Sequence, residues 1–495
     1  MISVESPEQQ EECVRIIYNE LAPRFNEFGS TVLHEQIQPV VQHALDSSTK
    51  EVDENQIGGP DGRRFQFTDT NLGVTPPRIS DIRAHSRSHS DDGQKKDAVI
   101  VDFKVSYLGD CNLQVRLLGI RGGVRDVQIE GRARLVMTPT LGTLPFVGGF
   151  QLCFLDEPKI DFDMEGLANI CDWPGLRRKV RKEILEDTAK RCVYPNRISI
   201  GMGVAQADVR LVKGFNPEGV LFVRVVRASD LPKKGGFRSL INQDKPDTYI
   251  KVSLGAMHHL TSVVKNDCNP EWPIEQWAEF PLETMEGHYV ILKAYDEDSL
   301  SRDEFLGRSA LTVKDILLEP SVTTSFIGDE SEKSKYDEVS GDVTIEARWM
   351  PFFPEGPHES ILPNQGSVAY CSVFIYSVNN LIENLNLASL ESGLPTTRLV
   401  IAYGEKKFKS SWEKNDPHPR YETGGHFLLK YHEIEDSGVV TVSIVTKDDV
   451  VMSEVSLPIQ AMIHEPLRKK MVQIEPDLKP HLTMTLSADV KFLRM

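Results

Sequence analysis

The stretch LVMTPTLGTLPFVGGFQLCFL, residues 135–155, contains no charged residue in a chain of which 26% is charged. It is long enough for a transmembrane helix, because about 20 apolar residues in helical conformation cross the hydrocarbon core of a bilayer. Pro139 and Pro145 would interrupt such a helix twice. Apolar and polar residues alternate before the stretch, over residues 126–134, and every second residue within its last part is apolar: Phe150, Leu152 and Phe154. This period of two predicts two half-buried strands joined by a Pro/Gly loop.

Composition places the chain among soluble globular proteins. Its 495 residues, 40% of them hydrophobic, predict about three domains. The net charge of −17 disfavours nucleic acid as a partner and repels an anionic membrane unless it is locally offset. The N-terminus has neither the basic region nor the apolar core of a signal peptide, which predicts a cytosolic protein. The seven cysteines lack C-x-x-C spacing and indicate reduced thiols rather than a zinc site.

The pattern of apolar and polar residues changes along the chain. Residues 8–45 have helical periodicity, residues 63–165 are rich in strand patterns, and a second helix is expected near 176–191. After residue 219 short strands alternate with turns, as is typical of β-sandwiches. We therefore predict an α+β first domain and two all-β domains around a Pro-rich linker: 1–200, then 215–350, the linker 351–366, and a second, degenerate sandwich 367–495.

Motifs in both parts of the chain resemble known families. In the middle region ASDLP, KPDTYIKVSLG, CNPEWPIEQWAEFPL and LKAYDEDSLSRDEFLGRSALTV resemble the C2 domain. In the first region VDFKVSYLGDCNLQV, GGVRDVQIEGRARLVMTPTLGTLPFVGGFQLCFLDEPKIDF, GLANICDWPGL and YPNRI are similar to the SMP domain, the synaptotagmin-like mitochondrial lipid-binding domain. In this order they resemble the extended synaptotagmins.

The resemblance implies both a fold and a setting. The expected fold is an SMP (TULIP-like) lipid-binding barrel of curved antiparallel sheet plus helices, forming a homodimer end to end, followed by two C2 β-sandwiches. The expected partners are glycerophospholipids and anionic membrane surfaces. The family's N-terminal hydrophobic hairpin is not visible in this sequence. We therefore expect a peripheral protein on the cytosolic face of contact sites between the endoplasmic reticulum and the plasma membrane.

Apolar residues that share strand faces in the first region are candidates for a lipid-binding groove. Alternation alone favours an ordinary core, because it is the common pattern of any half-buried strand. The SMP resemblance favours a trough for acyl chains instead. The candidate lining residues are Val101, Phe103, Val115, Leu117, Ile129, Phe150, Leu152, Phe154, Ile160 and Phe162.

Acidic residues in the middle region match the calcium loops that the C2 resemblance implies. Calcium takes six to eight oxygen ligands, which clustered carboxylates on loops can supply. The matching positions are Asp247 in the first loop and Asp296, Asp298 and Glu304 in the third. Gly235 stands where the first loop normally carries another aspartate, which predicts weakened Ca²⁺ affinity. The alternative is a C2 fold that has lost calcium and keeps acidic turns as solvated surface.

Loop one of the same region combines basic and apolar residues. Such a loop can contact lipid headgroups while its apolar side chains insert, although a solvated loop is the alternative. The candidate contact residues are Lys233, Lys234, Phe237 and Arg238. In the last region only Asp448 and Asp449 remain of the acidic set, so that domain is expected to be calcium-silent.

Three function classes compete for this sequence. The first is non-vesicular glycerophospholipid transfer between apposed membranes with calcium-regulated docking. The second is a calcium-dependent phospholipid-binding adaptor or tether without lipid transfer. The third is an enzyme, but the sequence contains no G-x-S-x-G, G-x-x-x-x-G-K-[ST], H-E-x-x-H or kinase H-R-D motif. We therefore predict a lipid-transfer protein that is not an enzyme.

Overall fold

The computed structural model describes most of the chain in segments. Its contacts divide the chain into two compact units, the first formed by 1–86, 99–136 and 152–198 and the second by 87–98, 137–151 and 199–495. Besides residues 16, 20, 24 and 27, the described ranges are 30–42, 65–73, 75–87, 90–91, 94–95, 97–117, 120–165, 176–204, 207–232, 245–298, 303–329, 339–353, 367–381, 396–414, 416–435, 438–475 and 482–493.

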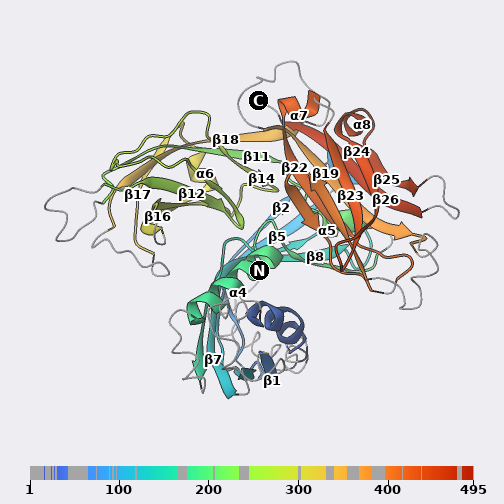
Figure 1. The fold of residues 1–495 in the computed structure, drawn as a ribbon, viewed down its shortest axis with the longest axis horizontal. Coiled ribbons are helices and arrows are strands. Elements are labelled where there is room, and N and C mark those ends of the chain that lie inside the picture. The colour runs from blue at the N-terminus through green and yellow to red at the C-terminus, as the bar shows by residue number, and fades with distance from the viewer. Residues whose placement is uncertain are drawn as a thin grey trace, which may run out of the picture. The chain divides into compact units, whose positions relative to one another are not determined.

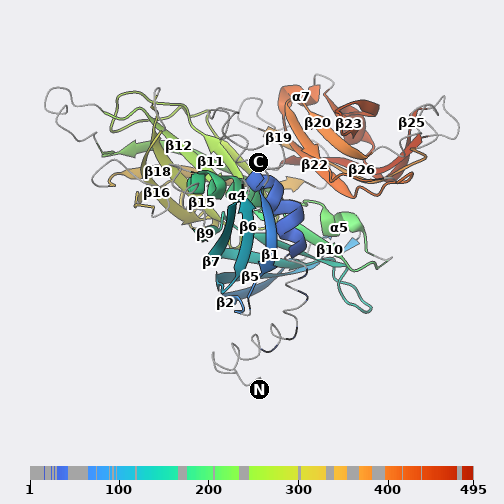
Figure 2. The ribbon, with the colours of Figure 1, turned by 60° about the horizontal axis from the view of Figure 1, so that its bottom comes forward.

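The first region is a curved sheet with helices. Among the described residues, eight strands form the sheet in the order β1-β6-β7-β5-β2, with β8 and β9 pairing with β7 and β10 pairing with β8. Figure 2 shows β1, β6 and β7 side by side in this order. The strands are β1 (Gln66–Asn71), β2 (Arg78–Arg87), β5 (Ala98–Leu108), β6 (Asn112–Leu117), β7 (Ile120–Met137), β8 (Gly149–Phe154), β9 (Lys159–Glu165) and β10 (Ile198–Gly201). The other elements are η1 (Leu33–Ile37), the short pair β3 (Ser90–Asp91) and β4 (Gln94–Lys95), α4 (Leu176–Cys192) and α5 (Val209–Lys213).

The uncharged stretch forms strands and not a membrane helix. Residues 135–137 end β7, residues 138–148 form the connection, and β8 follows, which confirms the predicted strand–loop–strand arrangement. In the part of the chain that the structure describes, no helix is both long and apolar enough to cross a membrane.

Helical residues close one core of the first unit. Val41 of the N-terminal helical segment and Val180 of α4 are 4% and 2% exposed. They belong to one hydrophobic cluster with residues from β1, β6, β7 and β9: Phe67, Leu113, Val115, Val124 and Phe162. This core therefore joins the strands to helices far away in the sequence.

A buried ion pair links β5 to its neighbour β7. Nε and Nη2 of Arg134 donate hydrogen bonds to the two carboxylate oxygens of Asp102 at 2.6 and 2.8 Å. The two side chains are 3% and 13% exposed. Burial lowers the pKa of Arg134, but the hydrogen bonds and charge of Asp102 outweigh it and raise that pKa. The alternating pattern suggests that the polar residues of β7 face solvent, and Arg134 departs from it because Asp102 supplies a partner inside.

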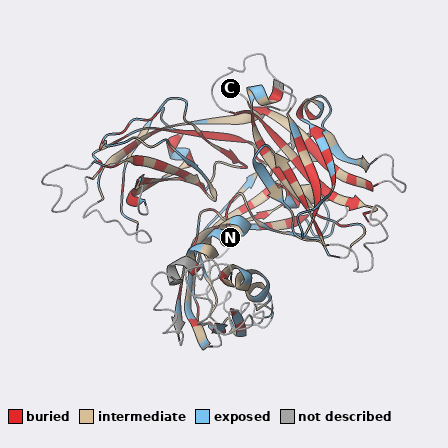
Figure 3. Ribbon diagram, in the orientation of Figure 1, coloured by how far each residue is buried: buried red, intermediate tan, exposed pale blue. Residues whose placement is uncertain are grey.

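Two sandwiches follow, and buried residues concentrate in their strands (Figures 1 and 3). The first has β11 (Gly219–Ser229), β12 (Thr248–Leu254), β13 (Met257–Leu260), β14 (Ala278–Leu282), β15 (Tyr289–Asp296), β16 (Glu304–Thr312), α6 (Val313–Ile316), β17 (Val322–Ser325) and β18 (Asp342–Phe353). The second has β19 (Ser367–Asn379), β20 (Thr397–Tyr403), β21 (Lys406–Lys409), β22 (Thr423–Lys430), α7 (Tyr431–Glu435), β23 (Val439–Thr446), β24 (Val451–Pro458), α8 (Ile459–His464), β25 (Leu467–Glu475) and β26 (Leu482–Leu493).

The two sandwiches repeat one topology. Each contains a four-stranded sheet of the same order, β13-β12-β15-β16 in the first and β21-β20-β23-β24 in the second. Their other strands share one larger sheet, because the end of β18 pairs with β26 through Phe352 opposite Leu493 and Phe353 opposite Phe492. Together with the first sheet, this arrangement confirms the predicted α+β and all-β fold class.

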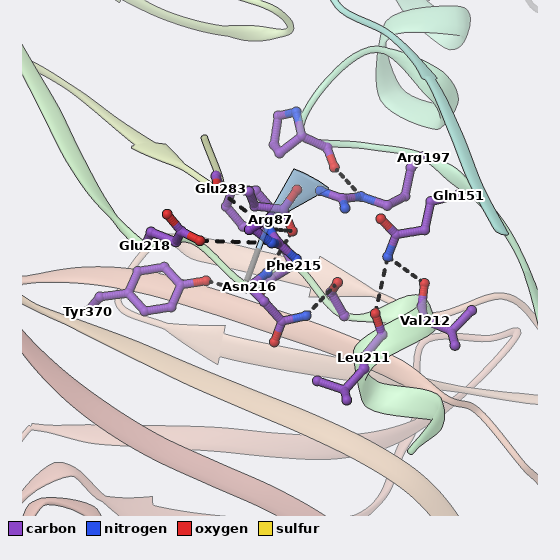
Figure 4. A network of polar contacts seen from close by, with 12 residues as sticks. Arg87, Gln151, Arg197, Leu211, Val212, Phe215, Asn216, Glu218, Glu283 and Tyr370 are labelled. Atoms are coloured by element: carbon purple, nitrogen blue, oxygen red, sulfur yellow. Dashed lines mark hydrogen bonds and ion pairs between the residues drawn. The ribbon is translucent and has the colours of Figure 1, made fainter. Parts of the chain in front are cut away.

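Polar contacts tie several segments together inside the second unit (Figure 4). Arg87, at the end of β2, lies 3.8 Å from Oε1 of Glu218 and 3.9 Å from Oε1 of Glu283. The backbone N–H of Asn216 donates to the same Glu283 oxygen at 3.1 Å. Burial raises the pKa of Glu218, and Arg87 opposes this shift. The segment after α5 is therefore fixed to residues from both the first sheet and the first sandwich.

Candidate functional site

Strand β8 buries the face that carries Gln151 and Cys153 and leaves its other, apolar face partly open. Gln151 is 3% exposed, and its Nε2 donates to the backbone oxygen of Val212 at 2.7 Å (Figure 4). Leu152, on the opposite face, is 42% exposed. Phe150 and Phe154 share the Leu152 face and are half-buried. A strand face in contact with solvent is normally polar, so the partly exposed face of Phe150, Leu152 and Phe154 is an open apolar surface.

The structure places the predicted groove residues in two groups. Val115 and Phe162 are 1% and 7% exposed and pack in the closed core described above. The side chain of Leu117 lies outside the described residues. Ile160 is half-buried and packs against the same core. The remaining candidates are half-buried, apart from the more exposed Leu152: Val101, Phe103, Ile129, Phe150 and Phe154.

Strand β10, which pairs with β8, adds apolar residues that the sequence reasoning missed. Ile198 and Ile200 are 50% and 60% exposed and share one face, since successive strand residues alternate. The pattern Ile-Ser-Ile could have indicated them, but the strand has only four residues. Exposed isoleucines on β10 thus accompany the exposed leucine of β8, the strand with which β10 pairs.

Three of the predicted calcium ligands meet at one end of the first sandwich. Asp296 and Glu304 lie opposite each other on β15 and β16 and are 2% and 5% exposed. The backbone N–H of Asp247 donates to Oδ1 of Asp296 at 2.7 Å, while Oδ1 of Asp247 accepts from the N–H of Asn266 at 2.7 Å. The register of β15 with β16 and the hydrogen bond from Asp247 therefore place these three residues at one end of the sandwich.

Asp298, the fourth predicted ligand, lies two residues beyond the end of β15 and is half-buried. Its N–H donates to Oδ1 of the exposed Asp303 at 3.3 Å, and Oδ2 of Asp303 accepts from the Tyr249 hydroxyl at 2.7 Å. The carboxylate of Asp303 thus links the backbone of Asp298 to the hydroxyl of Tyr249.

Carboxylate oxygens are the ligands that Ca²⁺ prefers, so the chemistry of this set fits the ion. Within the described ranges, however, no group of three or more histidine, cysteine, aspartate or glutamate side chains is arranged to hold a metal. Loop one, residues 233–244, lies outside the described residues, and with it Lys233, Lys234, Gly235, Phe237 and Arg238.

Strand register shows which residues of the second sandwich occupy the positions of the predicted calcium ligands. Thr248 of β12 lies opposite Asp296, and in the corresponding strands Thr397 lies opposite Thr446. Thr446 therefore occupies the position of Asp296, and Thr396 that of Asp247. Nη2 of Arg398 lies 3.2 Å from Oδ1 of Asp449. Two carboxylates are replaced by threonines, and a neighbouring one is paired with an arginine.

Comparisons with known proteins agree with this domain order. The family model described as the Synaptotagmin-like mitochondrial-lipid-binding domain matches residues 24–203, and the C2 domain model matches residues 219–327. Human Extended synaptotagmin-3 is 30% identical over 325 residues, 65% of this chain. Human Extended synaptotagmin-2 is 25% identical over 366 residues, 71% of this chain. A solved structure of Extended-Synaptotagmin 2 that holds its SMP domain and two C2 domains covers 99% of this chain and is itself covered completely, with a TM-score of 0.63 at 20% identity.

The matches cover only part of the curated relatives. The aligned regions span 34% of human Extended synaptotagmin-3 and 38% of human Extended synaptotagmin-2. Across that shared part, the SMP model is followed by the C2 model, and the fold matches that of a solved member over nearly the whole chain. The chain therefore contains an SMP domain followed by a C2 domain, the domain order of the extended synaptotagmins to which it is similar.

Proposed function

We propose that this chain binds glycerophospholipids along its first sheet and transfers them between apposed membranes, at contacts between the endoplasmic reticulum and the plasma membrane. The observation that supports the proposal most is the open apolar face of β8, on which Leu152 is 42% exposed between the half-buried Phe150 and Phe154. Ile200 of the paired strand β10 is 60% exposed. Residues of an ordinary core would be buried rather than exposed. Bound acyl chains would cover these exposed apolar residues.

The energetics explain why an apolar surface of this length is needed. A two-chain phospholipid carries about 30 methylene groups, and exposing each one to water costs about 0.8 kcal/mol. Free exchange between bilayers therefore requires a surface that offsets most of this cost. Half-buried apolar side chains on several neighbouring strands, among them Phe103, Ile129 and Phe154, supply such a surface.

The full chain, purified without added lipid, is expected to retain glycerophospholipid with little headgroup selectivity, because the proposed surface contacts acyl chains. Mass spectrometry of the lipids extracted from the purified protein checks this. Sedimentation of the same preparation checks the homodimer through the SMP domain that the family resemblance motivates. A lipid-free protein that also fails to take up a fluorescent phospholipid would contradict lipid binding and would favour the adaptor without transfer.

We also propose that the first C2 domain docks on anionic membranes when Ca²⁺ binds. Asp247, Asp296 and Glu304 are brought to one end of the sandwich, and Asp298 follows β15. These carboxylates repel an anionic surface, and a bound Ca²⁺ would neutralise them. Lys233, Lys234, Phe237 and Arg238 are proposed to contact the membrane beside them. The second C2 domain is proposed to be calcium-silent because threonines occupy two of its ligand positions.

Co-sedimentation of the full chain with phosphatidylserine-containing liposomes across a Ca²⁺ titration tests this docking. We expect half-maximal binding on the order of 10 μM Ca²⁺ or more, because Gly235 removes one charge from the set. Asp298→Asn should abolish the response. Asp448→Asn is the matched control, since Asp448 holds the corresponding position two residues after Thr446. Equal binding in Ca²⁺ and in chelator would show that the acidic turns are only solvated surface.

A further inference from the structure

The connection between β7 and β8, residues 138–148, turns back on itself and is here called the Leu144 hairpin. The N–H of Thr138 donates to the oxygen of Gly149 at 3.0 Å, and the N–H of Gly148 donates to the oxygen of Pro139 at 2.8 Å. Nearer the tip, the N–H of Leu141 donates to the oxygen of Phe146 at 2.7 Å. Backbone hydrogen bonds and the bridge between Thr140 and Val147 therefore hold the two sides of this connection together.

The base of the hairpin is fixed on both sides. The N–H of Thr140 donates to the oxygen of Asp97 at 2.9 Å, and the N–H of Met202 donates to the oxygen of Gly148 at 2.9 Å. A Cβ on Gly149 would lie 2.4 Å from a methyl carbon of Val212, so only glycine permits this close approach. All of these residues belong to the second compact unit, which also contains both C2 domains.

The tip, in contrast, presents large apolar side chains to solvent. Leu144 is 78% exposed and Phe146 is 56% exposed. Phe146 also has a φ of 69°, an uncommon conformation for a bulky residue and one that a functional constraint can explain. Tight turns normally carry polar residues, and no charged residue occurs from 135 to 155. The tip is thus built without the groups that would keep it in water.

We propose that the tip of the Leu144 hairpin inserts into the surface of a lipid bilayer. Uncharged turns that expose an aromatic and an aliphatic side chain suit the interface between headgroups and acyl chains. The hairpin leads directly into Phe150 of β8, at the beginning of the proposed acyl-chain surface. It also shares a compact unit with the C2 domains that are proposed to dock. The partner that covers the tip is therefore a membrane. The tip would lie where a lipid enters the acyl-chain surface, and this role at the entrance rests on the proposed function.

Tryptophan fluorescence of the full chain tests insertion directly. Phe146→Trp is mixed with phosphatidylcholine–phosphatidylserine vesicles, with and without brominated acyl chains, in the presence of Ca²⁺. Bromine quenches tryptophan only at close range, so we expect additional quenching relative to the unaltered protein. Leu318→Trp is the matched control, because Leu318 is 79% exposed on the first sandwich and is not proposed to insert. Equal quenching in both variants, or none in Phe146→Trp, would overturn the proposal, as would a chain that does not bind vesicles at all.

A second variant distinguishes a membrane from a second copy of the chain as the partner of the tip. It also distinguishes membrane insertion from lipid binding. Leu144→Ser with Phe146→Ser is expected to weaken vesicle binding about tenfold, because two apolar side chains no longer leave water. Its retained lipid and its sedimenting mass should stay unchanged. Loss of a dimer in this variant, without quenching in Phe146→Trp, would identify a second copy as the occupant and overturn the proposal. Quenching in a chain that holds no lipid would leave insertion standing and would contradict only the lipid-binding function.

Discussion

Replacing Phe150 and Phe154 together with aspartate is expected to lower retained phospholipid about tenfold or more. Both side chains are half-buried on the open apolar face of β8. A carboxylate there must either lose its hydration beside a bound acyl chain or keep water next to that chain, and either outcome costs several kcal/mol. Lipid mass spectrometry and uptake of a fluorescent phospholipid measure the effect.

The matched control adds the same charge to polar faces of the same sheet. Ser106 on β5 and Gln128 on β7 are exposed, so Ser106→Asp with Gln128→Asp should leave lipid retention unchanged. Unaltered circular dichroism shows that the phenylalanine variant is folded. Normal lipid loading in that folded variant would mean that β8 does not line the lipid path.

Asp102→Ala is expected to destabilise the first domain by about 3–5 kcal/mol, because it leaves the guanidinium of Arg134 buried without this carboxylate. The side chain of Arg134 is 3% exposed and donates two hydrogen bonds to Asp102. For a domain of this size, the midpoint of thermal unfolding should fall by roughly 6 to 20 °C. Scanning calorimetry of the full chain resolves this transition.

An exposed pair between the same two strands provides the control. Nζ of Lys104 lies 2.7 Å from Oε1 of Glu130, with the side chains 41% and 48% exposed. Solvent screens such a pair, so Glu130→Gln should change the midpoint little. Replacing both Asp102 and Arg134 with leucine should recover most of the loss, because no buried charge remains. Similar shifts in Asp102→Ala and Glu130→Gln would show that burial does not set the strength of these pairs.

The sequence predicted the strands and the second helix of the first region close to their observed positions. It also predicted the two sandwiches. The helix expected at 176–191 is α4, Leu176–Cys192, and the strands around residues 135–155 end at Met137 and begin at Gly149. Helical and strand periods are local properties, so a single sequence carries them. The resemblance to the extended synaptotagmins also depended only on the order of motifs.

Local patterns could not say which strand face is covered, because the covering residues lie far away in the sequence. The period of β8 separates Gln151 from Leu152, but Gln151 is buried because Val212 of α5 offers it a backbone acceptor. Val115 and Phe162 similarly pack against helical Val41 and Val180, while Phe103 stays half-buried. The candidate groove residues that stay half-buried and those in the closed core are alike in sequence and differ only in tertiary contacts.

The sequence by itself determined the period of each strand, the identity of the four acidic positions and the uncharged hairpin between β7 and β8. Only the tertiary structure placed Asp296 opposite Glu304 and Thr446 opposite Thr397, and only it exposed Leu144 at a hairpin tip. The physical reason is that propensity and alternation act over a few residues. Register, burial and exposure depend on which distant strands and helices come to lie beside them.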